Sequence, residues 1–78
     1  MHEIVYYEYR QNNPVMEFIL QRSPKEQAKI LREIDLLEEF GFTLGLPYVK
    51  KVVNTGLWEL RIRHGSNIYR MFYVEICN

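Results

Sequence analysis

The sequence has little of what several kinds of site require. Cysteine occurs once, at Cys77, which excludes an internal disulfide and leaves no thiolate cluster for zinc. The two histidines, His2 and His64, are far apart in the sequence and give little support to a metal site. The chain also has no phosphate-binding glycine loop and no nucleophile elbow. We therefore expect neither a metal nor another cofactor.

Long hydrophobic runs and a secretory leader are also missing. No apolar run approaches the roughly 20 residues that span a bilayer. Met1-His2-Glu3 is followed by a strand-like pattern and not by a basic region with an apolar segment, so we expect a cytoplasmic protein with no membrane partner. Ten basic and ten acidic residues give zero net charge. Any binding of a polyanion must therefore come from local clustering of charge.

The composition favours one small folded domain over residues 1–78. Hydrophobic residues make up 47% of the chain and charged residues 26%, values typical of globular proteins and not of disordered ones. A chain of this length buries only about 60% of the surface that its unfolded form exposes. We therefore expect marginal stability.

Three segments have the composition or the alternation that predicts β-strands. Glu3–Tyr9 is rich in β-branched and aromatic residues and is predicted as the first strand. Leu57–Arg63, the second, alternates between apolar and charged side chains. Ile68–Ile76, the third, follows a turn that we expect at His64–Asn67.

Two start signals predict two helices between the first and second strands. Asn13-Pro14 offers an N-cap and a proline at the first helical position, for a helix that we expect to end near Arg22. Ser23-Pro24-Lys25-Glu26 is a capping box. The helix that it opens has an apolar stripe up to Phe40 and should end at Gly41. The short connection predicts an antiparallel helical hairpin.

The order strand, helix, helix, strand, strand predicts an α+β fold in which the helical hairpin packs on one face of a small antiparallel sheet. The sheet face toward the helices should carry Trp58, Leu60, Ile62, Tyr69, Met71 and Tyr73. The opposite face should carry Glu59, Arg61, Arg63 and Arg70, with the apolar Phe72 and Val74 beside them.

Three arginines of that opposite face are the first candidates for chemistry. Arg61 and Arg63 lie two residues apart on one strand, and Arg70 comes from the next strand across a short turn, so the three can converge. Spacing alone leaves two interpretations open. Glu59 and Glu75 could neutralise a solvated face, or the guanidiniums could bind a phosphate through their fork of N–H donors.

The lysines have two interpretations as well. Lys50 and Lys51 precede the second strand and either belong to a solvated loop or extend the arginine cluster. The second helix has a basic ridge at helical spacing, which is either an ordinary solvated face or a binding surface. This ridge comprises Lys25, Lys29 and Arg32, with Glu26 and Glu33 beside it.

Two further side chains could act as a general base. Glu59 is flanked by arginines that would keep it ionised, and it is either their ion-pair partner or a base. His64 has a suitable unperturbed pKa but sits in a polar turn, where solvated residues are common.

The sequence resembles a known family in two linked segments. These are L-W-E-L-R-I-R (Leu57–Arg63) and Y-R-M-F-Y (Tyr69–Tyr73), preceded by a capped helical hairpin and the approach K-K-V-V-N-T-G-L. They resemble the RelE/ParE toxin superfamily, and within it the chain is most similar to the HigB-like, phage Gp49-like branch. The resemblance covers essentially the whole chain. It implies a small toxin of a type II toxin–antitoxin pair, which cleaves mRNA in the ribosomal A site and is inhibited by a helix-turn-helix, HigA-like antitoxin.

The resemblance also implies a reaction, in which a ribose 2′-OH attacks its own 3′-phosphate without a metal. That reaction needs a base, an acid and cations around the phosphate. Arg61 and Arg70 match arginines that the family uses there, but arginine cannot act as the base. The predicted catalytic residues are Arg61, Arg70, Lys50, Lys51 and Glu59. The predicted RNA-binding residues are Arg63, Lys25, Lys29 and Arg32.

Family members continue beyond the third strand into a further strand, a basic segment and a final helix. The resemblance therefore predicts a C-terminally shortened member of the family. Three functions stay open at this point. The chain is an mRNA endoribonuclease, a ParE-like gyrase inhibitor, or an inactive remnant that only binds its antitoxin, for instance through the open edge of its last strand.

Overall fold

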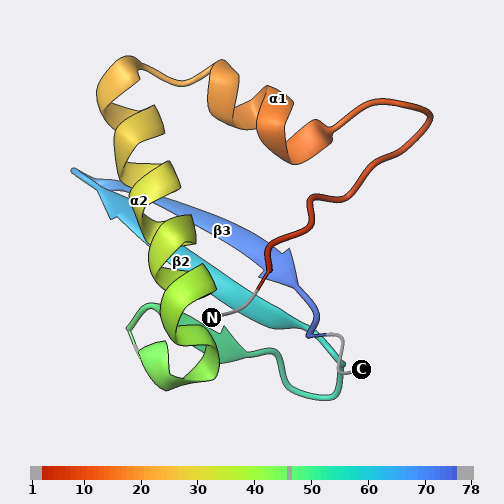
Figure 1. Cartoon of the computed structure of the whole chain (residues 1–78). Helices are drawn as coiled ribbons and strands as arrows, with labels where there is room; N and C mark the ends of the chain where they lie inside the picture. Colours follow the sequence, from red (N-terminus) through yellow and green to blue (C-terminus); the bar gives the residue numbers. More distant parts are fainter. Residues whose placement is uncertain (1–2, 46, 76–78) are drawn as a thin grey trace. The chain divides into compact units, whose positions relative to one another are not determined.

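The computed structural model describes residues 3–45 and 47–75. The chain forms two compact units, Met1–Gly41 and Phe42–Asn78. Within these described residues, the first unit contains two α-helices and the second a three-stranded antiparallel sheet (Figure 1). This content confirms the predicted α+β class. The predicted packing of the helices on one face of the sheet stays a prediction.

The first helix, α1 (Pro14–Leu20), begins where its capping signal predicts. The Asn13 side chain accepts a hydrogen bond of 3.1 Å from the backbone N–H of Met16. The helix ends two residues before the expected Arg22. Arg22 instead donates from Nε to the carbonyl of Phe18 (3.3 Å), which also accepts from the backbone N–H of Gln21 (3.3 Å).

The second helix, α2 (Pro24–Phe40), contains the predicted capping box. The Ser23 hydroxyl accepts from the backbone N–H of Glu26 at 3.2 Å, and the Glu26 carboxylate accepts from the backbone N–H of Ser23 at 3.3 Å. The helix ends at Gly41, as predicted, with a φ of 56° that favours glycine. A 3-10 helix, η1 (Gly41–Leu44), follows. The buried residues of α2 are Ile30, Glu33, Ile34 and Leu37.

The first predicted strand, Glu3–Tyr9, is wrong. Residues 3–8 have no regular secondary structure, and a β-bridge joins Tyr9 only to Asn12. Between these two residues the chain makes a tight turn in which Arg10 and Gln11 both have positive φ, as in a type I′ turn. β-Branched and aromatic residues pack well on the pleated surface of a sheet, but a strand forms only where another strand supplies the hydrogen bonds. Val5 shows the result, since 82% of its surface is exposed.

The sheet consists of β1 (Val49–Lys51), β2 (Trp58–His64) and β3 (Asn67–Tyr73) in that spatial order. The strands β2 and β3 confirm the second and third predicted strands with shifted ends, and Ile76, the expected end of the third, lies outside the described residues. The remaining strand of the sheet is thus β1 and not Glu3–Tyr9. β1 is only three residues long, too short for an alternating pattern to reveal.

The turn between β2 and β3 consists of Gly65 and Ser66, because His64 and Asn67 are already paired. The loop is therefore shorter than the predicted turn, His64–Asn67. A two-residue hairpin loop with glycine first is the II′ turn, and Gly65 has the positive φ of 60° that this turn needs. Such a turn fixes the register of the two strands that it joins.

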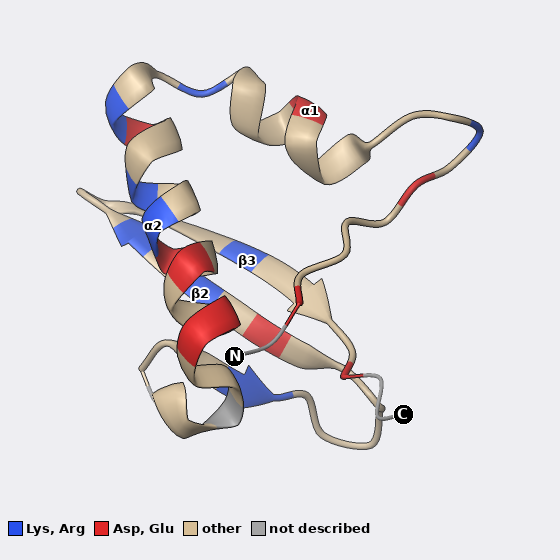
Figure 2. Cartoon of the chain, in the orientation of Figure 1, with Lys and Arg blue, Asp and Glu red and all other residues tan. Residues whose placement is uncertain are grey.

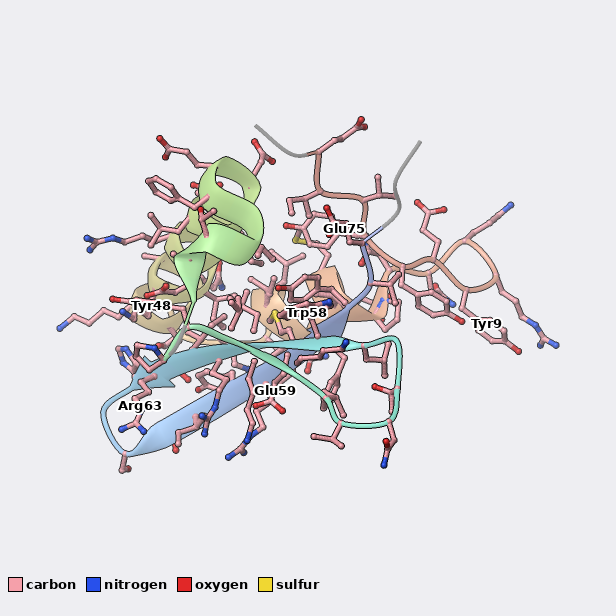
Figure 3. All side chains as sticks on the ribbon, turned by 90° about the horizontal axis from the view of Figure 1, so that it is seen from below. Tyr9, Tyr48, Trp58, Glu59, Arg63 and Glu75 are labelled. Carbon is pink, nitrogen blue, oxygen red and sulfur yellow. The ribbon has the colours of Figure 1, made fainter. Side chains whose placement is uncertain are left out.

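The sheet divides its side chains between two faces as predicted. Leu60 and Ile62 are buried, and their register partners Met71 and Tyr69 share their face. On the other face Arg70 is exposed. Figure 3 shows Trp58 and Glu59, which are neighbours on β2, on opposite sides of the sheet, with Arg63 on the side of Glu59. We call the side that carries Glu59 and Arg63 the outer face.

Candidate functional site

The register of the hairpin brings two arginines together. Arg61 on β2 and Arg70 on β3 are Cα partners, so their side chains leave the same face with Cβ atoms about 5 Å apart. Glu59 lies two residues before Arg61 on that face. Its Oε1 is 3.3 Å from Nε of Arg61 and 3.5 Å from Nε of Arg70. One carboxylate oxygen therefore holds both guanidiniums.

This arrangement is electrostatically unusual, because like charges directly opposite each other on a sheet repel. Glu59 offsets the repulsion between Arg61 and Arg70 and is the least exposed of the three side chains, at 16% against 28% and 49%. A guanidinium that meets a carboxylate through Nε can still offer its outer N–H donors to a second anion. The cluster can thus accept a phosphate in addition to Glu59.

The first strand adds lysines to this cluster. Lys50 is the Cα partner of Glu59 and so lies on the outer face. Lys51 pairs with Trp58, and alternation gives it the opposite face. Both side chains are exposed. Lys50 therefore shares the face of the arginines, whereas Lys51 belongs to the opposite face by register.

These residues line a concavity of about 290 Å³ within the second unit. Two basic residues come from β1 and two from the β2–β3 hairpin, with a single carboxylate among them. Figure 2 shows the basic segments of all three strands together with the acidic segment of β2. The lining consists of Lys50, Lys51, Val52, Val53, Glu59, Arg61 and Arg70.

Val52 and Val53 line the concavity although sequence reasoning missed them. They lead into a turn that is held by the Thr55 hydroxyl, which donates to the carbonyl of Val52 (2.9 Å) and accepts from the N–H of Leu57 (3.1 Å). Val53 is 75% exposed. The position of the two valines directly after two lysines is the feature of the sequence that could have indicated them. They provide an apolar wall beside the charged groups.

Some predicted residues lie apart from the concavity. Arg63 is on the outer face but pairs with Ile68, one step further along the hairpin, and does not line the concavity. His64 is the last residue of β2 and does not line it either.

The predicted basic ridge is on α2, in the first unit. Lys25 and Arg32 are exposed. Lys29 is 2.8 Å from the buried carboxylate of Glu33, so its charge is already paired. The predicted ridge therefore has less unpaired positive charge at its central residue, Lys29, than the sequence indicates.

Charge is distributed unevenly between the two units. Met1–Gly41 contains five basic and eight acidic residues, whereas Phe42–Asn78 contains five basic and two acidic residues. The first unit therefore carries a net charge of −3 and the second +3. The zero net charge of the chain conceals a basic unit in which the concavity lies.

Two further observations concern metal-binding groups and proton acceptors in the part of the chain that the structure describes. It contains no group of three or more His, Cys, Asp or Glu side chains placed to hold a metal ion. Among the side chains of the concavity, Glu59 is the one whose ordinary chemistry includes accepting a proton at neutral pH, because the others are basic or apolar. A separate finding is that none of the described helices has the length and apolar character needed to cross a membrane.

Comparison with known proteins relates most of the chain to one family. A family model described as Phage derived protein Gp49-like matches residues 17–75, which include the whole sheet and the concavity. No curated protein and no solved structure matched the chain. The Gp49-like family is related to the RelE/HigB-type toxins, so that membership indicates a toxin of the toxin–antitoxin type and implies an antitoxin partner. The match covers more than half of the chain, which therefore belongs to the Gp49-like phage-derived family.

Proposed function

We propose that this protein is a type II toxin that cleaves mRNA on the ribosome and holds the scissile phosphate in the concavity. The observation that carries the proposal is the pairing of Arg61 with Arg70 around Glu59, since two guanidiniums within reach of one anion suit a phosphodiester. Family membership supports the toxin class. The basic charge of the second unit supports an RNA substrate.

The reaction proposed for this site is an internal transfer. The ribose 2′-oxygen attacks the adjacent phosphorus, the bond from phosphorus to the 5′-oxygen of the next nucleotide breaks, and a 2′,3′-cyclic phosphate remains. Negative charge grows on the phosphate oxygens in the transition state. Arg61 and Arg70 stabilise that charge from the outer donors of their guanidiniums.

Glu59 and Lys50 supply the proton transfers in this proposal. Glu59 accepts the proton of the 2′-OH, a role that the arginines cannot fill because they stay protonated. Lys50, the register partner of Glu59, donates a proton to the leaving 5′-oxygen. Lys51, which also lines the concavity, contributes positive charge.

The remaining predicted residues are assigned to binding. Arg63, further along the outer face, and the exposed Lys25 and Arg32 of α2 contact ribosomal RNA in this proposal. Lys29 contributes little, because Glu33 neutralises it. A helix-turn-helix antitoxin inhibits the toxin, and both act in the cytoplasm.

The direct test uses purified protein, ribosomes and mRNA. Arg70→Ala should reduce cleavage about 100-fold, the typical result of removing one preorganised donor from a developing anion. Arg10→Ala removes a positive charge from the first unit and serves as the matched control. Undiminished cleavage in Arg70→Ala would remove the site assignment.

Other outcomes identify other functions. Gyrase inhibition with intact mRNA would assign the chain to the ParE-like activity. Binding of the antitoxin without growth arrest or cleavage would identify a protein that retains only its antitoxin contact.

A further inference from the structure

Phe72 is an aromatic side chain among the charged groups of the outer face. It is the Cα partner of Glu59, so both side chains leave the sheet on the same side. Its exposed fraction is 58%. The other aromatic residues of β3, Tyr69 and Tyr73, are by contrast partly buried on the opposite face. A single exposed apolar residue needs no explanation by itself. The residues next to Phe72 on the outer face are what suggest a function for its exposed ring.

The register places Phe72 next to the arginine pair on the outer face. Phe72 and Arg70 are two residues apart on one strand, so their Cα atoms are separated by about 7 Å on the same face. The guanidinium of Arg70 approaches Glu59, which is directly opposite Phe72. A nucleotide whose phosphate lies at Arg61 and Arg70 has its base within reach of this ring.

We propose that Phe72 is a base-stacking residue, on which a nucleobase adjoining the bound phosphate lies. The inference rests on the proposed function in one respect, namely that the anion at the arginines is an RNA backbone. Single-stranded RNA is the occupant that the charge favours, because the unit carries +3 and the concavity has four basic residues against one acidic. Proteins bind single strands by combining such cations with exposed aromatic rings.

The experiment separates contacts to the base from contacts to the backbone. A short 2′-O-methyl RNA, which has no 2′-OH to attack the phosphate, is titrated with the full chain at low ionic strength, and binding is followed by fluorescence anisotropy. A second oligonucleotide has the same backbone without bases at its central positions. Phe72→Ala should weaken binding of the first oligonucleotide about 10-fold, as expected for loss of one stacked base, and leave the second unchanged.

Companion variants exclude simpler explanations. Phe72→Trp should keep the affinity, whereas Phe72→Leu, which is apolar but has no ring, should lose it. Arg70→Ala should weaken binding of both oligonucleotides alike. Leu20→Ala removes a comparably exposed apolar side chain from α1 and should change neither. Circular dichroism of every variant checks that the fold is kept.

Several results would overturn the inference. Equal weakening of both oligonucleotides by Phe72→Ala, no weakening of either, or absence of any binding by the unsubstituted chain would each do so. Unchanged RNA binding together with lost self-association in sedimentation would assign the ring to a protein contact and contradict the stacking role. Because the oligonucleotide cannot be cleaved and no ribosome is present, a failure of the proposed cleavage would appear in a different assay.

Discussion

Arg61 and Arg70 lie directly opposite each other across the β2–β3 hairpin, and both guanidiniums contact the same carboxylate oxygen of Glu59. Glu59 therefore supplies, from within the chain, an anion that the two guanidiniums share. In the proposed reaction it both orients the arginines and accepts a proton. These two roles can be separated by a substitution that keeps the shape of Glu59 and removes its charge.

Glu59→Gln should affect binding and cleavage in opposite directions. Binding of the non-cleavable RNA should become tighter, because no internal anion competes for the arginines, whereas cleavage should fall by about 100-fold or more with the loss of the proposed base. Anisotropy titration and the ribosome assay measure the two effects. Glu75→Gln, which removes an exposed carboxylate after β3, is the control for net charge. Cleavage that stays at the original rate would exclude Glu59 as the base.

Lys50 and Lys51 are adjacent in the sequence but should differ in their effect on RNA binding. Because Lys50 shares the outer face with Glu59 and Lys51 pairs with Trp58, Lys50→Ala should lower the slope of log affinity against log salt concentration by about 0.7, the value for one phosphate contact in a single strand. Lys51→Ala should change that slope less. Titrations at several salt concentrations provide the comparison, and equal slopes for the two variants would contradict the assignment by face.

The Lys29–Glu33 pair should matter for stability more than for RNA. Glu33 is buried, its Oε1 is 2.8 Å from Lys29, and its Oε2 has no hydrogen-bond partner among the described residues. Lys29→Met should cost about 1–3 kcal/mol in the free energy of unfolding, because it leaves a buried carboxylate unpaired.

Removing the carboxylate as well should reverse most of that loss. Glu33→Met in the Lys29→Met background replaces the pair by apolar groups, which is often neutral or stabilising. Urea unfolding measures both variants, with Lys25→Met as an exposed control on the same helix. A double variant less stable than Lys29→Met alone would show that Glu33 has a further partner.

Tyrosine ionisation should limit stability at alkaline pH. Burial, followed by the charge of Glu75, raises the pKa of the Tyr73 hydroxyl above 10.0, and burial with the charges of Asp35 and Glu38 raises the pKa of Tyr6 likewise. Between the unfolded and folded pKa values the folded state holds more protons, so the free energy of unfolding falls as the pH rises above about 10. The stability that the two protonated tyrosines contribute is fully present below that pH.

Tyr73→Phe tests the assignment of this alkaline loss. The hydroxyl is buried without a hydrogen-bond partner within residues 3–45 and 47–75, so its removal should be neutral or slightly stabilising at pH 7. The decline of stability above pH 10 should become shallower. Urea unfolding between pH 8 and about 11 checks both expectations, and an unaltered decline would assign it to other groups.

The sequence allowed much of the geometry of the candidate site to be predicted, for identifiable reasons. Strict alternation in β2 and the short turn at Gly65 determined that Arg61 and Arg70 would share a face with Glu59. Capping signals predicted both helix starts, because hydrogen bonds at Asn13 and Ser23 are local interactions. Local chemistry of this kind can be seen in a single sequence.

Non-local pairing could not be predicted in the same way. Glu3–Tyr9 has strand composition without a pairing partner, while Val49–Lys51 is too short to show a period and still joins the sheet through β2. Consequently only the register of β1 shows that Lys50 and Lys51 belong to opposite faces of the sheet. The concavity beside Val52 could not be predicted for the same reason. Both depend on contacts between residues that are distant in the chain.

The uneven distribution of charge has a practical consequence for the behaviour of this protein in solution. A molecule with one unit at −3 and the other at +3 can attract copies of itself even though its charges sum to zero. Added salt screens such attraction within about 10 Å at 0.1 M. The protein should therefore dissolve better as salt is added, whereas the proposed RNA binding should weaken over the same range. Preparations made at high salt to keep the protein in solution would therefore make the proposed RNA binding harder to detect.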